Sequence, residues 1–167
     1  MAADLAALAG RALVDLRQGP WPGLTQMNLG DRGDRLAHEL LVAQLAEHRP
    51  SDLVLSEEGT EDQDRLEADR CWIIDPLDGS SDYARPRSIE WAVHVALVQD
   101  QQPVAAAVAV PGLAETYDTE RGAFPPACDR DRPLVVSGRR TAYVASVVAD
   151  ALDGELAACG SAGMKAM

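Results

Sequence analysis

Apolar residues recur with helical spacing in the first segment of the chain. Gly19-Pro20 follows this segment directly, and such a pair ends helices because glycine is flexible and proline cannot continue the hydrogen-bond ladder. We therefore expect one amphipathic helix over residues 2–18. The side chains expected on its apolar stripe are Leu5, Leu8, Ala12, Leu13 and Leu16.

A second helical pattern follows a polar stretch. Residues 21–32 contain glycine and proline among polar side chains, which predicts a loop. From about Asp34 to Glu47 the spacing is helical again, and Arg49-Pro50 marks where that helix should have ended. The side chains expected to face the core from this helix are Leu36, Leu40, Leu41 and Leu45.

Short apolar runs in the middle of the chain predict strands. Residues 52–56 and 71–74 have the length and composition of buried strands, and the charged residues 60–70 between them predict an exposed turn or short helix. Residues 90–98 and 104–110 predict a hairpin with residues 99–103 as its loop. Both hairpin strands are apolar on both faces, so we expect the sheet to be covered on each side.

Three further elements complete the pattern. Strands are expected at residues 113–119 and 134–137, and a helix at residues 143–152. Helices and strands in this order predict an α+β fold.

Composition and charge narrow the class of protein. The 167 residues suit one compact domain, and 47% of them are apolar, so a sizeable core can form. With 15 Lys and Arg against 27 Asp and Glu, the formal net charge is −12, which argues against a nucleic-acid polymer or an anionic membrane surface as the partner. No apolar run approaches the roughly 18 residues that span a membrane.

Two features bear on the cellular compartment. The residues that follow Met1 lack the basic and apolar regions of a secretory signal. Cys71, Cys128 and Cys159 are odd in number and far apart, which suits reduced thiols better than a disulfide framework or a zinc site. We therefore expect a soluble cytoplasmic protein.

Acidic residues follow two of the predicted strands, at the point where each strand ends. Glu57 and Glu58 follow the first strand, and Asp75 and Asp78 follow the second. If these strands are neighbours, the carboxylates converge, and converging carboxylates repel each other unless a cation or a proton intervenes. Hard oxygen ligands of this kind suit Mg²⁺.

Residues 75–79, Asp-Pro-Leu-Asp-Gly, are expected to form a turn of restricted geometry. Pro76 fixes its own φ and lacks an N–H, so the turn could aim both aspartates and the Leu77 carbonyl at one point. The next residues offer backbone N–H groups and hydroxyls to a phosphate, and metal ligands beside a phosphate site indicate phosphate-ester hydrolysis. The residues expected to contact the phosphate are Gly79, Ser80 and Ser81.

Each signal has a structural alternative. Asp-Pro and Asp-Gly are common turn dipeptides, and the two glutamates fit a solvated corner. An EF-hand is excluded because the acidic residues 62–64 lack the required glycine and glutamate downstream. His94 is expected to be a satisfied core residue, Cys71 a packed thiol, and His38 and His48 helix-surface residues.

These motifs match a known pattern. Residues 72–80 closely resemble the signature Trp-Ile-Ile/Val-Asp-Pro-Ile/Leu-Asp-Gly-Thr/Ser of the inositol monophosphatase superfamily. Residues 56–58 resemble its upstream acidic element, Asp34 matches its earlier acidic residue, and residues 160–165 resemble its later Gly-Ser-x-Gly-x-Lys segment. Residues 90–97 are similar to the actinobacterial CysQ branch, the 3′(2′),5′-bisphosphate nucleotidases. The resemblance covers nearly the whole chain and implies the N-terminal half of a layered sugar-phosphatase fold, with an antiparallel sheet packed against helices.

The resemblance also implies a role for each motif residue. Glu57, Asp75 and the Leu77 carbonyl would hold one Mg²⁺. Asp78 would share a second ion with Asp75, and Glu57 would help to hold a third, looser ion. The groups that would orient and deprotonate the attacking water are Asp34 and the Ser80 hydroxyl. Those that would contact the phosphate are Gly79, Ser80 and Ser81.

Two features depart from the family pattern. Position 80 is Ser where the family usually has Thr, which keeps the hydroxyl and loses a methyl group. The family continues with a second α/β domain bearing a Trp-Asp motif. We therefore expect residues 1–155 to form an N-terminal α+β metal-binding phosphatase domain and residues 156–167 to begin the second domain. The sequence is then a fragment or a natural truncation, and a truncated product should leave an apolar face open near residues 141–167.

Two classes of function follow from the sequence. The first is a Mg²⁺-dependent phosphatase that removes the 3′-phosphate of 3′-phosphoadenosine 5′-phosphate in sulfur assimilation, with inositol monophosphatase or fructose-1,6-bisphosphatase activity as the runner-up. The second is a catalytically silent remnant that binds a metal or a partner. The expected ligand is a small phosphorylated substrate, and a homodimer is left open because family members often dimerise.

Overall fold

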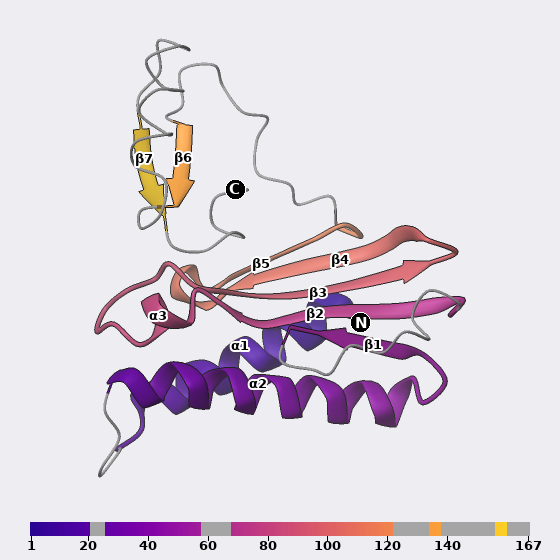
Figure 1. Cartoon of the computed structure of the whole chain (residues 1–167), viewed down its shortest axis with the longest axis horizontal. Coiled ribbons are helices and arrows are strands. Elements are labelled where there is room, and N and C mark those ends of the chain that lie inside the picture. The colour runs from indigo at the N-terminus through magenta and orange to yellow at the C-terminus, as the bar shows by residue number, and fades with distance from the viewer. Residues whose placement is uncertain (21–25, 58–67, 122–133, 138–155, 160–167) are drawn as a thin grey trace.

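Five strands form the main sheet of the chain, in the order β1-β2-β3-β4-β5 (Figure 1). The computed structural model describes residues 1–20, 26–57, 68–121, 134–137 and 156–159. β1 pairs with β2 in parallel, and the remaining pairs are antiparallel, which confirms the α+β class. The strands are β1 (Leu53–Ser56), β2 (Arg70–Asp78), β3 (Ala92–Gln99), β4 (Gln102–Val110) and β5 (Glu115–Asp118).

Helix α1 (Ala2–Gln18) has the bounds that the apolar stripe predicts. Leu5, Leu13 and Leu16 of that stripe are buried, whereas Leu8 and Ala12 are half-buried. Small residues provide the rest of the buried face, so the helix lies close to the sheet; they are Ala2, Ala6, Ala9 and Gly10.

Helix α2 (Gln26–His48) is longer than the sequence predicts. It begins at Gln26 rather than near Asp34, so the prediction of a loop over residues 21–32 is wrong from Gln26 onward. Glycine is a poor helix former, but tertiary packing overrides this preference where two helices need a close approach. Of the four leucines expected inside, two are fully buried and two half-buried; the buried pair is Leu41 and Leu45.

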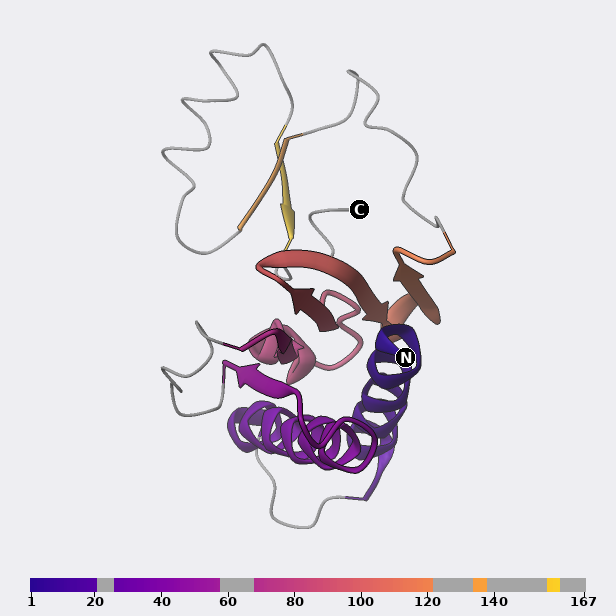
Figure 2. The ribbon, with the colours of Figure 1, turned by 90° about the vertical axis from the view of Figure 1, so that its right-hand side faces the viewer.

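Both long helices pack on the same face of the sheet (Figures 1 and 2). The core lies between them and the strand residues that face them, which include Trp72, Ile74, Val93, Val95 and Ala107. On the opposite face Ile73 is 42% exposed and Val104 is 53% exposed. Among the described elements the long helices therefore cover one face, and the expected cover on the second face is not seen there.

The hairpin between β3 and β4 turns more tightly than its sequence predicts. Gln99 pairs with Gln102, so the loop contains two residues, Asp100 and Gln101, rather than residues 99–103. Both have positive φ, 49° and 60°, which a two-residue hairpin of type I′ requires.

The remaining elements are short. A 3-10 turn, η2 (Pro111–Leu113), precedes β5, so the strand expected at residues 113–119 is confirmed over Glu115–Asp118. The strand expected at residues 134–137 is confirmed as β6 (Leu134–Ser137), which pairs in parallel with β7 (Leu156–Cys159). The predicted helix at 143–152, the segment 160–165, Cys128 and most of residues 60–70 lie outside the described residues. No described helix has the length and apolar character needed to cross a membrane.

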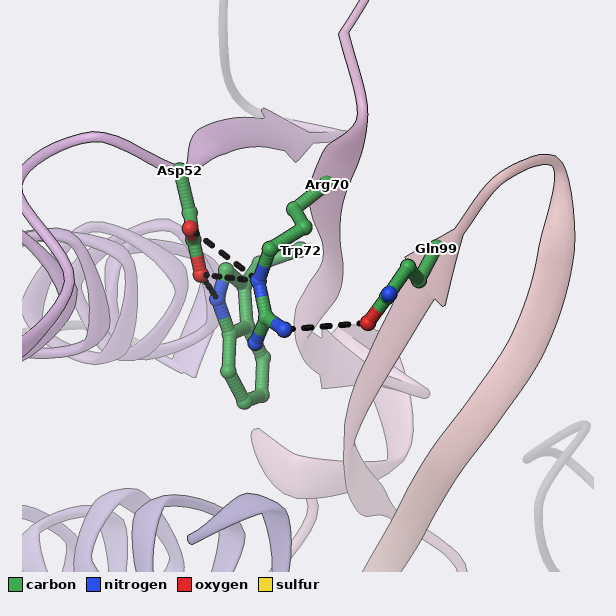
Figure 3. Close-up of polar contacts among 4 residues, drawn as sticks. All are labelled: Asp52, Arg70, Trp72 and Gln99. Carbon is green, nitrogen blue, oxygen red and sulfur yellow. Dashed lines mark hydrogen bonds and ion pairs between the residues drawn. The ribbon is translucent and has the colours of Figure 1, made fainter.

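A polar network joins the first three strands where β2 begins (Figure 3). Both Asp52 carboxylate oxygens lie 3.2 Å from the Arg70 Nε, and the Trp72 indole N–H donates to Asp52 at 2.9 Å. Arg70 also donates to the Gln99 amide oxygen at 3.0 Å. These bonds fix the register of the strands at the end opposite to the acidic residues.

Candidate active site at the acidic edge of the sheet

Parallel pairing brings the C-terminal end of β1 beside the C-terminal half of β2, at one edge of the sheet. Ser56 is level with Ile74, so Glu57 and Asp75 follow at the same height on neighbouring strands. We call Glu57, Asp75 and Asp78 the acidic edge. Glu57 is exposed, whereas Asp75 and Asp78 are partly buried. Glu58 lies outside the described residues.

Residues 75–78 form a bulged end of β2 rather than the turn that their sequence predicts. β2 continues through Pro76 to Asp78, with Asp75 level with His94 and Asp78 level with Ala92. Three steps along β2 thus match two along β3, which is the extra residue of a β-bulge. Proline is tolerated here because a bulged position does not need its N–H for the ladder.

The bulge brings both aspartates to the same imidazole. His94 is level with Asp75, yet its Nε2 lies 3.2 Å from Oδ2 of Asp78. Residues three apart on a regular strand point to opposite faces, and the extra residue changes that alternation. His94 therefore has a hydrogen-bond partner, as predicted, but it is half-buried, and that partner is Asp78 of the candidate site.

Asp75 has both a buried carboxylate oxygen and a raised pKa. Its Oδ1 is buried and has no hydrogen-bond partner among the described residues. The pKa of its carboxyl is raised to about 6, chiefly by burial and also by the charges of Asp78 and Glu57. His94 and the hydrogen bond from the Leu77 backbone act in the opposite direction. A buried carboxylate oxygen without a hydrogen-bond partner is unfavourable near other carboxylates, and a bound cation would offset that cost.

The donors of the acidic edge fit a hard divalent cation in their chemistry. They are carboxylate oxygens, which Mg²⁺ prefers as ligands. The role of the Leu77 carbonyl stays a prediction; the Leu77 side chain is buried in the core. Within the described part of the chain, no three His, Cys, Asp or Glu side chains lie close enough together to ligate one ion directly. Electrostatic repulsion between carboxylates acts over longer distances than a Mg–O bond of roughly 2 Å. The carboxylates can therefore repel each other without all lying within bonding distance of one ion.

One face of α2 contacts both Ser56, at the end of β1, and Ser80, which follows β2. A Cβ on Gly30 would lie 3.1 Å from the Ser80 carbonyl oxygen, and the His38 Nδ1 lies 2.8 Å from Oγ of Ser56. Residues four apart share a helix face, so Asp34 lies between these two contacts. Asp34 therefore shares the face of α2 that makes these two contacts. His38 was expected on the helix surface, but it is half-buried and bonded to Ser56.

Glycine at position 79 is required where β2 passes into α3 (Ser80–Tyr83). Its φ is 86°, and a Cβ there would lie 2.7 Å from the Glu90 carbonyl oxygen. The N–H groups of Asp82 and Tyr83 donate to the Gly79 carbonyl, at 2.8 Å each, so the predicted phosphate contacts concern the N–H groups before them in the chain. Ser80 is half-buried and Ser81 is exposed.

A clamp from α1 holds the chain that follows α3. The Arg17 guanidinium donates to the carbonyls of Ser88, at 2.7 Å, and of Arg85. It also lies over the rings of Tyr83 and Trp91, 5.7 and 5.9 Å from their centroids. Sequence patterns do not reveal this clamp, because its members are far apart along the chain.

Residues 15–152 match the family model described as "Inositol monophosphatase family". The chain is 39% identical over 181 residues to the Mycobacterium leprae protein named 3′-phosphoadenosine 5′-phosphate phosphatase, covering 100% of this chain and 66% of the relative.

Solved structures show the same fold. CysQ from Bacteroides thetaiotaomicron superposes with a TM-score of 0.74 at 28% identity, over 98% of this chain and 72% of that one. Inositol monophosphatase II from Staphylococcus aureus gives a TM-score of 0.76 at 19% identity, over 97% of this chain and 66% of that one. The chain thus spans about two thirds of the length of the Mycobacterium leprae and Staphylococcus aureus proteins.

Proposed function

The chain belongs to the inositol monophosphatase family, and from this membership and the acidic edge of its sheet we propose that it carries the metal-binding part of a Mg²⁺-dependent phosphomonoesterase. The observation that carries the proposal is the buried Oδ1 of Asp75, which has no hydrogen-bond partner among the described residues. A buried carboxylate oxygen in this state is costly unless a cation or proton binds it.

In the proposed site, bound Mg²⁺ supplies charge neutralisation and lowers the pKa of a water molecule. Asp34, on the face of α2 that carries the Gly30 and His38 contacts, would accept a proton from the attacking water, and the Ser80 hydroxyl would orient that water. The N–H groups that begin α3 bind the phosphate oxygens. The residues that would hold two to three ions are Glu57, Asp75, Asp78 and, through its carbonyl, Leu77. Those that would contact phosphate are Gly79, Ser80 and Ser81.

The proposed substrate is a small bisphosphorylated nucleotide, 3′-phosphoadenosine 5′-phosphate, which loses its 3′-phosphate. Support comes from the name and the 39% identity of the Mycobacterium leprae relative. The Staphylococcus aureus inositol monophosphatase, at 19% identity, shows the fold alone, so inositol monophosphatase or fructose-1,6-bisphosphatase activity is the weaker candidate. A cytoplasmic setting and the division into residues 1–155 and 156–167 stay predictions; β6 pairs with β7 across that division.

Phosphate release from 3′-phosphoadenosine 5′-phosphate tests the proposal. We expect release that depends on Mg²⁺ and that falls by at least about 100-fold in Asp75→Asn, because the variant removes a charged ligand. Asp100→Asn is the matched control, since Asp100 is an exposed acid in the distant β3–β4 turn and asparagine accepts its positive φ. A chain that binds Mg²⁺ but releases no phosphate would favour the silent remnant instead.

A further inference from the structure

We propose that His94 is a positioning residue that holds the Asp78 carboxylate in place for the cation. The inference rests on the proposed function, because it concerns the same acidic edge. It assigns a role to a side chain whose surroundings in the sequence are those of a core residue.

The hydrogen bond between these two side chains has a defined direction. The His94 Nε2 lies 3.2 Å from Oδ2 of Asp78. An ionised carboxylate can only accept, so the imidazole nitrogen donates. The two side chains are 29% and 13% exposed, and shielding from water strengthens such a bond.

The position of His94 on β3 explains how its side chain reaches the acidic edge. Val93 and Val95, its neighbours on the strand, are fully buried against the helices. His94 points to the opposite face because side chains alternate along a strand. There it is level with Asp75 in the register, and its ring extends past the bulge to Asp78.

Holding one carboxylate oxygen fixes the direction of the other. Groups that orient metal ligands in this way typically change metal affinity by about 10- to 100-fold when they are removed. An imidazole anchored on a central strand is a rigid support, because β3 is paired on both sides, with β2 and with β4. His94 would therefore act through Asp78 and not through contact with the substrate.

Mn²⁺ titration followed by electron paramagnetic resonance tests this role with two variants of similar polarity. The Gln side chain of His94→Gln can place an amide N–H near the position of Nε2, whereas the shorter Asn side chain of His94→Asn cannot reach Asp78. We expect His94→Asn to weaken Mn²⁺ binding by about 10-fold and His94→Gln to stay within about threefold of the unsubstituted chain. Melting in the presence of EDTA should be similar for the two variants, and His48→Asn is the control for loss of an exposed imidazole.

The outcomes separate this inference from the proposed function. Equal affinity in His94→Asn and the unsubstituted chain would overturn the positioning role while leaving the site intact, as would equal weakening in both His94 variants. If the unsubstituted chain binds no Mn²⁺, or if Asp75→Asn binds it equally well, the metal site and the positioning role both fall.

Discussion

A Cβ atom on Gly33 of α2 would lie 2.8 Å from Cε1 of Tyr83 in α3 and 2.9 Å from Cδ2 of Leu77. Real Cβ atoms do not approach their neighbours so closely. The absence of a side chain at Gly33, and at Gly30 one turn earlier, therefore lets α2 lie directly against α3 and the end of β2. This close packing brings the part of α2 that carries Asp34 against the end of β2.

Gly33→Ala should lower the free energy of unfolding by up to about 2 kcal/mol. Helix propensity alone would favour alanine by about 1 kcal/mol, but overpacking against Tyr83 and Leu77 costs about 1–3 kcal/mol. Urea denaturation measures the difference. Ala43→Gly, at an exposed position of the same helix, isolates the propensity term and should destabilise by about 1 kcal/mol. A Gly33→Ala variant more stable than the unsubstituted chain would contradict the packing argument.

The raised pKa of Asp75 predicts the direction of the pH dependence of stability. Because the pKa is about 6 in the folded state, above its ordinary value, the folded chain binds a proton more tightly than the unfolded chain. The free energy of unfolding should therefore fall as the pH rises from about 4 to about 6, and then level off.

Metal-free urea denaturation at several pH values measures this effect. We expect a loss of about 1 kcal/mol across the window, less than the full shift implies, because solvent screens the partly exposed carboxyl. Asp75→Asn, which cannot ionise, should lack this loss, and added Mg²⁺ should reduce it in the unsubstituted chain. Identical pH profiles for the two proteins would disprove the assignment to Asp75.

Arg17→Ala should destabilise the chain by about 2 kcal/mol. The substitution removes two hydrogen bonds to backbone carbonyls and the stacking over Tyr83 and Trp91. Arg17→Lys keeps the charge but not the planar, forked donor, so an intermediate loss is expected. Arg11→Ala, at an exposed position of the same helix, is the control and should change stability by less than about 0.5 kcal/mol. Equal effects at the two arginines would argue against the clamp.

Asp52→Ala should separate stability from metal binding. It leaves the Arg70 guanidinium and the Trp72 indole N–H without their shared acceptor, which should cost about 2 kcal/mol. Asp52→Asn keeps an oxygen for Trp72 and should cost about half as much. Mn²⁺ affinity should not change, because Arg70 and Asp78 stand at opposite ends of β2, roughly 25 Å apart at the rise of a strand. A weakened affinity in a folded variant would show that the two ends of β2 are coupled.

The sequence predicts the chemistry of the acidic edge better than its geometry. The ends of the apolar runs locate Glu57 and Asp75, although β2 continues past Asp75 as far as Asp78. The bulge at Pro76 could not be predicted, because an Asp-Pro-x-Asp-Gly sequence has the composition of a turn. Only pairing with β3 keeps these residues in the strand.

Interactions between distant segments account for the other differences. The sequence pattern places the start of α2 too late because Gly30 and Gly33 lower the local helix propensity. These glycines are favourable only because α2 packs closely against α3. His38 and His94 were assigned to a helix surface and to the core because a single imidazole has no pattern. Their partners, Ser56 and Asp78, lie 18 and 16 residues away along the chain.

The acidic edge and the face of α2 beside it come from one uninterrupted stretch, from Gly30 to His94. During synthesis this stretch emerges from the ribosome before β4 and β5 emerge. If β1, β2 and β3 pair at that stage, the carboxylates already repel each other in a partly made protein, and a divalent cation can relieve that repulsion. Cellular Mg²⁺ would then affect how much of the chain reaches its folded form, in addition to any part it plays in turnover.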